Sequence, residues 1–192
     1  MPNKIICIVG MPGAGKSEAA DELVRKGFAF LRFGQITLDI IKEKGLEPIE
    51  KNEREIREDL RRKHGMGAFA LLNIPKIDEL LKKSDVVVDG LYSWSEYKIL
   101  KEKYGQAMFV VAVFAPPETR YRRLTARSVA GDEDQRFRNF TEEEAKSRDY
   151  AEIENLEKGG PIVMADFTII NIGTIVQLKE NLNKIISEIG SR

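Results

Sequence analysis

A glycine-rich segment near the start of the chain constrains the fold more than any other feature. Residues 10–17 read Gly-Met-Pro-Gly-Ala-Gly-Lys-Ser and fit the pattern G-x-x-x-x-G-K-[ST]. The segment follows an apolar run, Ile5–Val9, that is typical of a buried strand, and it precedes a helix that we expect over Ser17–Lys26. A glycine-rich turn between a strand and a helix is the context in which this pattern binds phosphate. The sequence therefore predicts an α/β domain with a phosphate loop at its first strand-to-helix turn.

The residue types in this loop suit a nucleoside triphosphate. Glycine lets backbone N–H groups curl around phosphate oxygens, and the N-terminus of the next helix adds a positive dipole. Lys16 can reach the outer phosphates, and the Ser17 hydroxyl can ligate Mg²⁺. We therefore expect ATP and Mg²⁺ at this loop. The residues assigned to nucleotide binding here are Gly10, Gly13, Ala14, Gly15, Lys16, Ser17 and Glu18.

Beyond the loop, apolar runs continue to alternate with stretches of helical periodicity. The runs typical of strands cover residues 28–33, 85–89, 108–115 and 166–171. Helical spacing or capping signals cover residues 35–44, 53–63, 66–72, 74–81, 93–104, 117–127, 141–159 and 176–189. Strands that alternate with helices call for a parallel sheet covered on both faces. We expect one domain over residues 1–192.

The charge balance and the cysteine count exclude several classes of protein. Lys and Arg together number 31, and so do Asp and Glu, which argues against a duplex-DNA binder. Cys7 is the only cysteine, so a disulfide framework and a cysteine-built zinc site are excluded. No charged-then-apolar leader precedes the first strand, and no apolar run is long enough for a membrane span. We expect a cytoplasmic monomer or homodimer that binds neither nucleic acid nor a membrane.

Asp89 is the candidate metal ligand outside the loop. It ends the Val86–Val88 run, so its carboxylate should lie at the carboxyl edge of the sheet, where open α/β sheets bind their ligands. A carboxylate at that edge can hold Mg²⁺ through water, beside the Ser17 hydroxyl. The alternative is a turn aspartate that only precedes Gly90. We assign Ser17 and Asp89 to a metal site.

A group of arginines in the later half of the chain is the second candidate feature. Arg120, Arg123 and Arg127 are spaced i, i+3, i+7 and so share one helix face. Arg148 follows in a polar segment at about 128–150 that we interpret as a lid. Phosphoryl transfer needs cations around a charged transition state, and a closed lid excludes water. A solvated charged stripe is the alternative for each of these arginines. The residues assigned to catalysis are Lys16, Arg123, Arg127 and Arg148.

Several segments together resemble a known family. They are the phosphate loop, Asp89-Gly90, the run Ala115-Pro116-Pro117-Glu118-Thr119-Arg120-Tyr121, and Ala165-Asp166 with Asn171. Their order is similar to that of archaeal-type adenylate-kinase-related proteins. These proteins belong to the nucleoside monophosphate kinase group and are close to the dephospho-CoA kinases. The resemblance covers nearly the whole chain.

This resemblance implies a P-loop NTPase fold, with a five-stranded parallel sheet in the order 2-3-1-4-5 flanked by helices. It implies a helical acceptor-binding insert at about 35–82 and a lid at about 128–150. Arg120 would stack on adenine, and the Asn171–Thr174 loop, with Gly173, would close the other side of the base. The residues that would surround the transferred phosphoryl group are Lys16, Arg123 and Arg127.

The acceptor site departs from the family pattern. The group carries Gly-Asp-x-x-Arg after its second strand, and residues 34–38 here read Gly-Gln-Ile-Thr-Leu, without that Asp and Arg. A second phosphate-holding Arg, expected shortly after Asp-Gly, is missing around Tyr92. Gln35 cannot accept a hydroxyl proton as the Asp of dephospho-CoA kinases would, although Asp39 could substitute for it. Leu38 stands where the phosphate-holding Arg of the insert is expected.

The sequence therefore predicts an ATP-dependent phosphotransferase that acts with Mg²⁺ on a small nucleotide-like acceptor. A nucleoside monophosphate is slightly favoured, because a phosphate nucleophile needs no general base. Dephospho-CoA kinase is the alternative enzyme, and an ATP-binding switch without acceptor turnover is the alternative from another class. The sequence leaves open the acceptor, the preference between ATP and GTP, and the oligomeric state.

Overall fold

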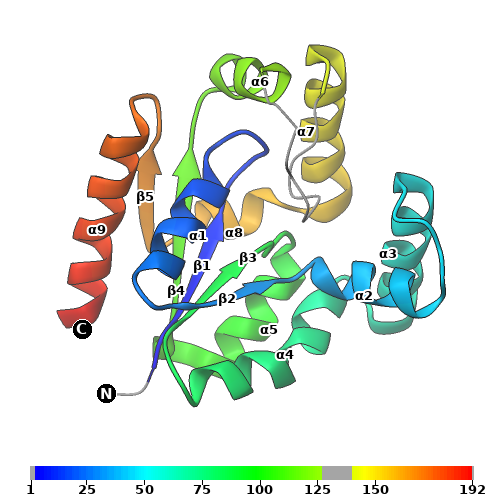
Figure 1. Cartoon of the computed structure of the whole chain (residues 1–192), viewed down its shortest axis with the longest axis horizontal. Coiled ribbons are helices and arrows are strands. Elements are labelled where there is room, and N and C mark those ends of the chain that lie inside the picture. The colour runs from blue at the N-terminus through cyan, green and yellow to red at the C-terminus, as the bar shows by residue number, and fades with distance from the viewer. Residues whose placement is uncertain (1–2, 127–139, 192) are drawn as a thin grey trace.

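A five-stranded parallel sheet forms the centre of the computed structural model, which describes residues 3–126 and 140–191. Figure 1 shows the strands, which run in the order β2-β3-β1-β4-β5. Their bounds are β1 Ile5–Val9, β2 Ala29–Arg32, β3 Val86–Asp89, β4 Met108–Phe114 and β5 Phe167–Ile170. The fold class predicted from the sequence, including this strand order, is confirmed.

The inner strands β3, β1 and β4 are covered on both faces, which explains why their sequences are apolar without alternation. Successive side chains of β1 enter different core clusters. Ile5 packs in the cluster on one face of the sheet and Ile6 in the cluster on the other. In register, Ile6 pairs with Val87 of β3 and with Phe109 of β4. The central strands therefore bury apolar side chains on both faces of the sheet.

Helices form a layer on each face of the sheet. Helices α1 (Lys16–Arg25) and α9 (Ile175–Ser191) pack on one face, and α4 (Ala68–Leu81) and α5 (Trp94–Tyr104) on the other. The remaining helices are α2 Gln35–Glu43, α3 Glu50–His64, the 3₁₀ turn η1 Gly105–Ala107, α6 Pro117–Thr125, α7 Glu142–Leu156 and α8 Gly159–Val163. None of the helices in the described part of the chain is long and apolar enough to cross a membrane.

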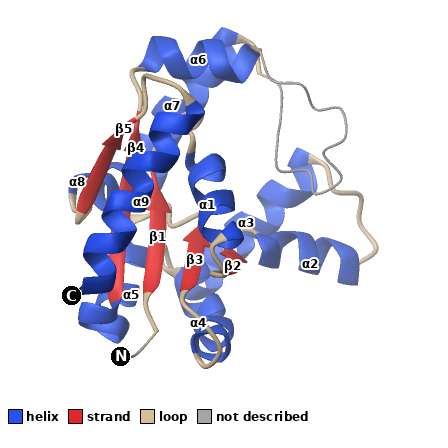
Figure 2. Cartoon of the chain, turned by 60° about the vertical axis from the view of Figure 1, so that its left-hand side comes forward, coloured by secondary structure: helices blue, strands red, loops and turns tan. Residues whose placement is uncertain are grey.

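The strands are parallel, so their carboxyl ends share one edge of the sheet, and β4 and β5 point toward α6 in Figures 1 and 2. Strand β1 lies between β3 and β4. The connections that follow neighbouring strands lead away from each other at this point of the sheet. In open parallel sheets this is where ligands bind. The loop after β1 and the end of β3 therefore lie at the edge where a site is expected.

The segments between the strands differ from the sequence-based expectation in some details. Helix α4 runs unbroken through Pro75, with Ala70 and Ile77 buried on either side of it, so core packing outweighs the lost N–H. The Gly159–Pro161 stretch, predicted to end a helix, instead opens α8, because proline is tolerated in a first turn.

The predicted acceptor-binding insert, about 35–82, contains α2, α3 and α4. Helices α2 and α3 extend sideways from the sheet in Figure 1, whereas α4 packs under β3 and belongs to the core layer. Of the predicted lid, about 128–150, residues 127–139 lie outside the described part of the chain. The rest of the lid forms the first part of α7, which opens with the predicted capping box of Thr141 and Glu144.

Glu96 is a fully buried carboxylate at the start of α5. Its Oε2 accepts hydrogen bonds from the N–H groups of Tyr92 (2.8 Å) and Ser93 (3.1 Å) and so completes a capping box. Its Oε1 has no hydrogen-bond partner. Burial is the largest influence and raises the pKa of Glu96 to about 7, against the opposing effect of the two N–H groups.

Because the pKa of Glu96 is higher in the folded chain than in the unfolded chain, folding binds a proton and stability falls as pH rises through this interval. Glu96→Gln imitates the protonated form and removes that dependence. Between about pH 5 and about pH 8, we expect wild type to lose on the order of 2 kcal/mol relative to Glu96→Gln. Urea unfolding of both proteins at both pH values measures this difference. Parallel pH profiles of the two proteins would contradict it.

Candidate phosphate-binding site

The loop between β1 and α1 has a backbone that only glycine adopts comfortably. Gly10, Gly13 and Gly15 have φ angles of 144°, 77° and 107°, in the range that side chains disfavour. A Cβ at Gly10 would lie 2.3 Å from the carbonyl oxygen of Val113, and one at Gly13 would lie 2.6 Å from that of Arg120. The glycines of the motif are therefore required by the close approach of β4 and α6 as well as by the curl of the loop.

Helix α1 begins inside this loop and directs its first N–H groups toward the carboxyl edge of the sheet. Gly15 is the N-cap in a left-handed conformation, and no side chain caps the helix. The N–H groups of Lys16 and Ser17 have no hydrogen-bond acceptor among the described residues. Unpaired N–H groups at the N-terminus of a helix form a ready site for an anion.

Lys16 reaches back across the loop, where its Nζ donates a hydrogen bond to the Met11 carbonyl oxygen (3.2 Å). The pKa of Lys16 is lowered to about 7, mainly by burial and next by the charge of Lys158, while Asp89 acts in the opposite direction. A phosphate placed beside Lys16 favours its charged form. An anion bound at the loop would therefore stabilise Lys16 in its charged form.

Ser17 and Asp89 are the residues that could hold a metal ion. Asp89 ends β3 opposite Ile8 of β1, and Ser17 lies in the first turn of α1, so both belong to the carboxyl edge of the sheet. The described residues contain no group of three or more His, Cys, Asp or Glu that could hold a metal. Mg²⁺ keeps several waters and takes ligands from substrate phosphates, so two protein oxygens suit it. Their role as metal ligands stays a prediction.

Asn171 anchors the loop to the opposite end of the chain. Its Nδ2 donates to the Ala14 carbonyl oxygen (2.7 Å), and its N–H donates to the carbonyl oxygen of Phe114 (2.7 Å). A Cβ at Gly15 would lie 2.3 Å from this Nδ2, so the third glycine of the motif makes room for the anchor. The predicted loop after β5 thus touches the phosphate loop directly.

Arg120 anchors the loop from α6. Its Nη1 donates to the Pro12 carbonyl oxygen (3.0 Å) and its Nε to that of Ala115 (3.0 Å). The guanidinium also pairs with Asp149 of α7 through two bonds, Nη1 to Oδ1 (2.9 Å) and Nη2 to Oδ2 (2.5 Å). The Tyr121 hydroxyl donates to Oδ2 of the same carboxylate (3.0 Å). One buried ion pair therefore joins the phosphate loop, α6 and α7.

This arrangement differs from the expectation that Arg120 stacks on adenine. The residue is only 4% exposed, and its donors are used by the protein itself. The i, i+3, i+7 spacing predicts that Arg120 shares an arginine face with Arg123 and Arg127. In the structure the Arg120 side chain is buried. Sequence reasoning missed Asp149, because nothing local marks a mid-helix carboxylate as the partner of a distant arginine.

The other predicted site residues are in different positions around this edge. Arg123 on α6 is half-buried, burial lowers its pKa, and its Nη1 is buried without a hydrogen-bond partner. Arg148 on α7 is exposed and donates from Nε to Oε1 of Glu152 (2.9 Å). Arg127 lies outside the described residues. Gly173 lies in the exposed loop after β5, and the Glu18 side chain lies in the first turn of α1.

Lys158 and Glu152 belong to the same edge and were missed by sequence reasoning. Both are buried, and Lys158 Nζ donates to Oε2 of Glu152. Their charges act on the pKa of Lys16, which brings them into the electrostatic neighbourhood of the phosphate loop. A lysine in front of Gly159-Gly160-Pro161 gives no sequence signal of burial, since lysine at the end of a helix is usually exposed.

The insert offers two further polar features. Gln35 Nε2 donates to Oδ1 of Asp39 (2.9 Å), so the two residues singled out in the sequence contact each other on α2. Arg61 on α3 packs over the Phe69 ring, with its guanidinium carbon 5.3 Å from the ring centroid, and its buried Nε has no hydrogen-bond partner. Arg61 is thus a cation in the insert that lacks a described anionic partner.

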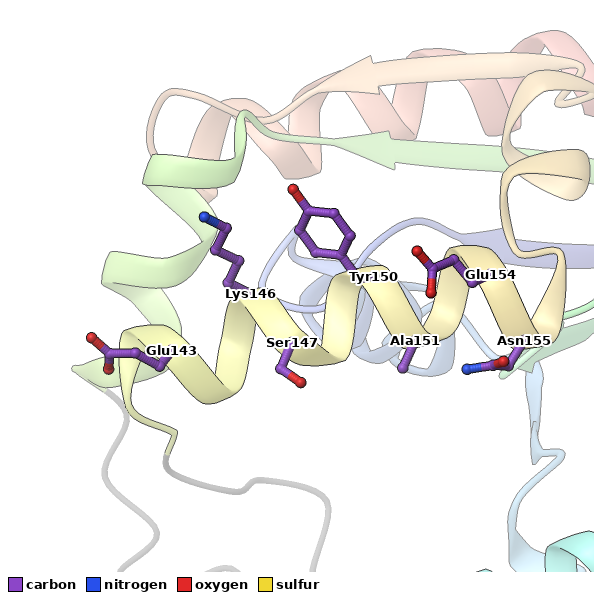
Figure 3. A pocket seen from close by; sticks show the side chains of 7 residues that line it. All are labelled: Glu143, Lys146, Ser147, Tyr150, Ala151, Glu154 and Asn155. Atoms are coloured by element: carbon purple, nitrogen blue, oxygen red, sulfur yellow. The ribbon is translucent and has the colours of Figure 1, made fainter.

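A separate hollow of about 490 Å³ follows α7 and contains no residue of the phosphate loop. In Figure 3, Lys146, Tyr150 and Glu154 extend on one side of the helix, and Ser147, Ala151 and Asn155 on another. Its lining residues are Glu143, Lys146, Ser147, Tyr150, Ala151, Glu154 and Asn155. All of the described lining residues come from one helix, so among them the hollow lacks polar groups that converge from several elements, as a catalytic site requires.

Comparison with known proteins agrees with the geometry. Residues 6–147 match the family model described as an AAA domain. A UPF0200 protein of Thermococcus kodakarensis is 34% identical over 190 residues, which cover 98% of this chain and 99% of the relative.

Two solved structures share the fold. A sugar kinase from Janibacter sp. HTCC2649 has a TM-score of 0.59 at 14% identity, covering 97% of this chain and 95% of its own. Shikimate kinase from Bacteroides thetaiotaomicron has a TM-score of 0.59 at 14% identity, covering 97% and 98%. At such identities the likeness is one of fold, and the fold is that of the P-loop kinases.

Proposed function

The chain belongs to the UPF0200 family and has a P-loop kinase-like fold, and from this premise we propose that it is an ATP-dependent small-molecule kinase. It binds ATP with Mg²⁺ at the phosphate loop and transfers the γ-phosphoryl group to a small, nucleotide-like acceptor. The observation that carries the proposal is the pair of cations Lys16 and Arg123, for which the described residues show no ion pair, at the edge where Asp89 is available for a metal.

In the proposed reaction an oxygen of the acceptor forms a bond to the γ-phosphorus. The bond between that phosphorus and the bridging oxygen breaks, and its electron pair leaves with ADP. Lys16 and Arg123 bind the phosphoryl oxygens as their charge grows, and the N–H groups at the start of α1 hold the phosphates in line. Bound Mg²⁺ would supply charge neutralisation between the outer phosphates, held by Ser17 and Asp89. Arg127, Arg148 and Gly173 keep their predicted roles only as proposals.

An anionic acceptor suits the insert better than a neutral one. Arg61 brings a half-buried guanidinium with an unpaired Nε to α3, which offsets the missing family arginines at Leu38 and Tyr92. An arginine fork binds phosphate and carboxylate well. We therefore place a nucleoside monophosphate ahead of other acceptors, with the region of about 35–82 as the acceptor-binding insert and about 128–150 as the lid.

A hydroxyl acceptor, as in dephospho-CoA kinase, is the second candidate. Asp39 favours it, because this exposed carboxylate on α2 could take the hydroxyl proton. The hydrogen bond from Gln35 to Asp39 counts against it, since the Oδ1 that could take the proton already accepts this bond.

The test is a panel of acceptors with purified protein, ATP–Mg²⁺ carrying a labelled γ-phosphate, and each nucleoside monophosphate, dephospho-CoA, shikimate and gluconate in turn. We expect transfer to at least one nucleoside monophosphate, with turnover on the order of 1–100 per second. The panel is repeated with GTP to determine the base preference.

Transfer to dephospho-CoA alone would favour the hydroxyl acceptor and Asp39. Tight ATP binding without turnover on any member of the panel would contradict the kinase proposal. It would favour an ATP-binding switch that changes shape without transferring phosphate.

A further inference from the structure

Lys158 is the one buried lysine among the residues that the structure describes. It follows α7, directly after Glu157, whose φ of 52° makes it the only described residue other than glycine with a positive φ. The N–H of Lys158 donates to the Glu152 carbonyl oxygen (3.3 Å) and so closes the turn. Left-handed conformations of non-glycine residues cost energy and persist where the surrounding structure requires them. Here the turn directs a lysine side chain into the protein.

The surroundings of Lys158 are those of the phosphate site. Its Nζ donates to Oε2 of Glu152 and lies 4.6 Å from the centroid of the Tyr92 ring, just beyond the carboxyl end of β3. Burial lowers the pKa of Lys158, and Glu152 opposes that effect. Asp89 also acts on Lys158, and Lys158 is the neighbouring charge that most strongly affects the pKa of Lys16.

Two cations of this cluster share one carboxylate. The cations that act on one another around the phosphate loop are Lys16, Arg148 and Lys158. The carboxylates that act on them are Asp89 and Glu152, and Glu96, whose pKa burial raises, also interacts with Lys158. Arg148 and Lys158 both donate to the single carboxylate of Glu152, through different oxygens. An ion pair with only a structural role would have no reason to lie near Lys16, a second lysine whose charge desolvation already penalises, because each cation makes the other harder to keep charged.

We propose that Lys158 is a catalytic residue that binds the γ-phosphoryl group from the side opposite Lys16, with Glu152 as the positioning residue that holds its ammonium in place. The proposal deepens the kinase function and rests on it. A phosphoryl group between the two lysines adds negative charge beside both of them, and Lys158 keeps all its protons throughout the transfer. The strained turn at Glu157 fixes the lysine at this position before ligand binds, as preorganised stabilisation of charge requires.

The experiment uses beryllium fluoride, a mimic of the phosphoryl group, so that no acceptor need be known. Calorimetry measures the affinity of ADP–Mg²⁺ with and without beryllium fluoride. For wild type we expect the mimic to tighten binding by roughly 10-fold or more. In Lys158→Met the affinity for ADP–Mg²⁺ alone should change by less than about 3-fold, whereas the tightening should fall below about 2-fold.

Two further variants keep the test decisive. Lys101→Met is the matched control, because Lys101 Nζ donates to the Met108 carbonyl oxygen at the opposite edge of the sheet, and it should tighten like wild type. If Lys158→Met is poorly folded by circular dichroism, the double variant Lys158→Met/Glu152→Gln decides, since it removes the buried charges together.

The inference is overturned if a folded Lys158 variant tightens as wild type does, or if wild type shows no tightening. Its failure is distinct from that of the kinase proposal. Turnover on the acceptor panel that does not depend on Lys158 would support the kinase proposal and contradict the catalytic role of Lys158. Tightening that depends on Lys158, without turnover on any acceptor, would support the binding of the phosphoryl group by Lys158 and contradict the kinase proposal.

Discussion

Lys16→Ala should abolish phosphoryl transfer, with kcat lower by on the order of 10³-fold or more, while the chain stays folded. Within the described part of the chain, the Lys16 side chain makes one hydrogen bond, to the Met11 carbonyl oxygen, so little of the described fold depends on it. Removing a cation whose charge is penalised by burial should leave the free energy of unfolding equal to or above that of wild type. Transition-state stabilisation is lost without a loss of structure.

Labelled-phosphate transfer measures kcat, and urea unfolding measures stability. The control is Lys26→Ala, which removes an exposed lysine just after α1 and should change neither quantity. If Lys16→Ala is folded and turns over at a near-normal rate, the assignment of the phosphate loop is wrong.

Arg120→Met should lower the free energy of unfolding by about 3–5 kcal/mol, the usual result of leaving one partner of a buried ion pair without the other. The change leaves Asp149 buried beside the Tyr121 hydroxyl, and it removes the donor to the Pro12 carbonyl oxygen of the phosphate loop. Methionine retains the apolar stem, so the loss reports the guanidinium. Urea unfolding at neutral pH measures it.

The matched control for Arg120→Met is Lys82→Met, which breaks a pair with Glu79 that is 67% exposed on both sides and should change stability by less than about 1 kcal/mol. An arginine that only stacked on adenine would behave differently. Its loss would raise KM for ATP and leave the free energy of unfolding unchanged. Normal stability with weakened ATP binding would therefore restore the stacking role.

Most of the fold could be predicted from the sequence because its signals are local. The unbroken apolar runs at Ile5–Val9 and Val86–Val88 indicate doubly covered strands, and the capping box at Thr141 marks the start of α7. The strand order came from the family resemblance rather than from periodicity. Helix α8 was missed because Gly159-Gly160-Pro161 is typical of a helix end as well as of a proline-containing first turn.

In the candidate site too, residues marked by local signals were predicted and residues defined by distant contacts were not. Lys16 and Ser17 follow from a contiguous motif, and Asp89 follows from its place at a strand end, so spacing alone finds them. Asp149 and Lys158 could not be found in this way, because each is defined by a partner in space and by burial. Burial of a charged side chain has no periodicity, since charged residues are exposed in almost every other setting.

The bond from Asn171 to the Ala14 carbonyl oxygen has a consequence for the order of assembly. The phosphate loop lies near the beginning of the chain, and its anchor is separated from it by 157 positions. During translation the loop emerges from the ribosome long before Asn171 does. Strand β1 pairs with β3 and β4, and both of these strands are synthesised after it. Contacts over such separations close late, because loop entropy must be overcome first. The phosphate loop is therefore encoded early and anchored late, and a nascent chain that ends before β5 carries the motif without the anchor.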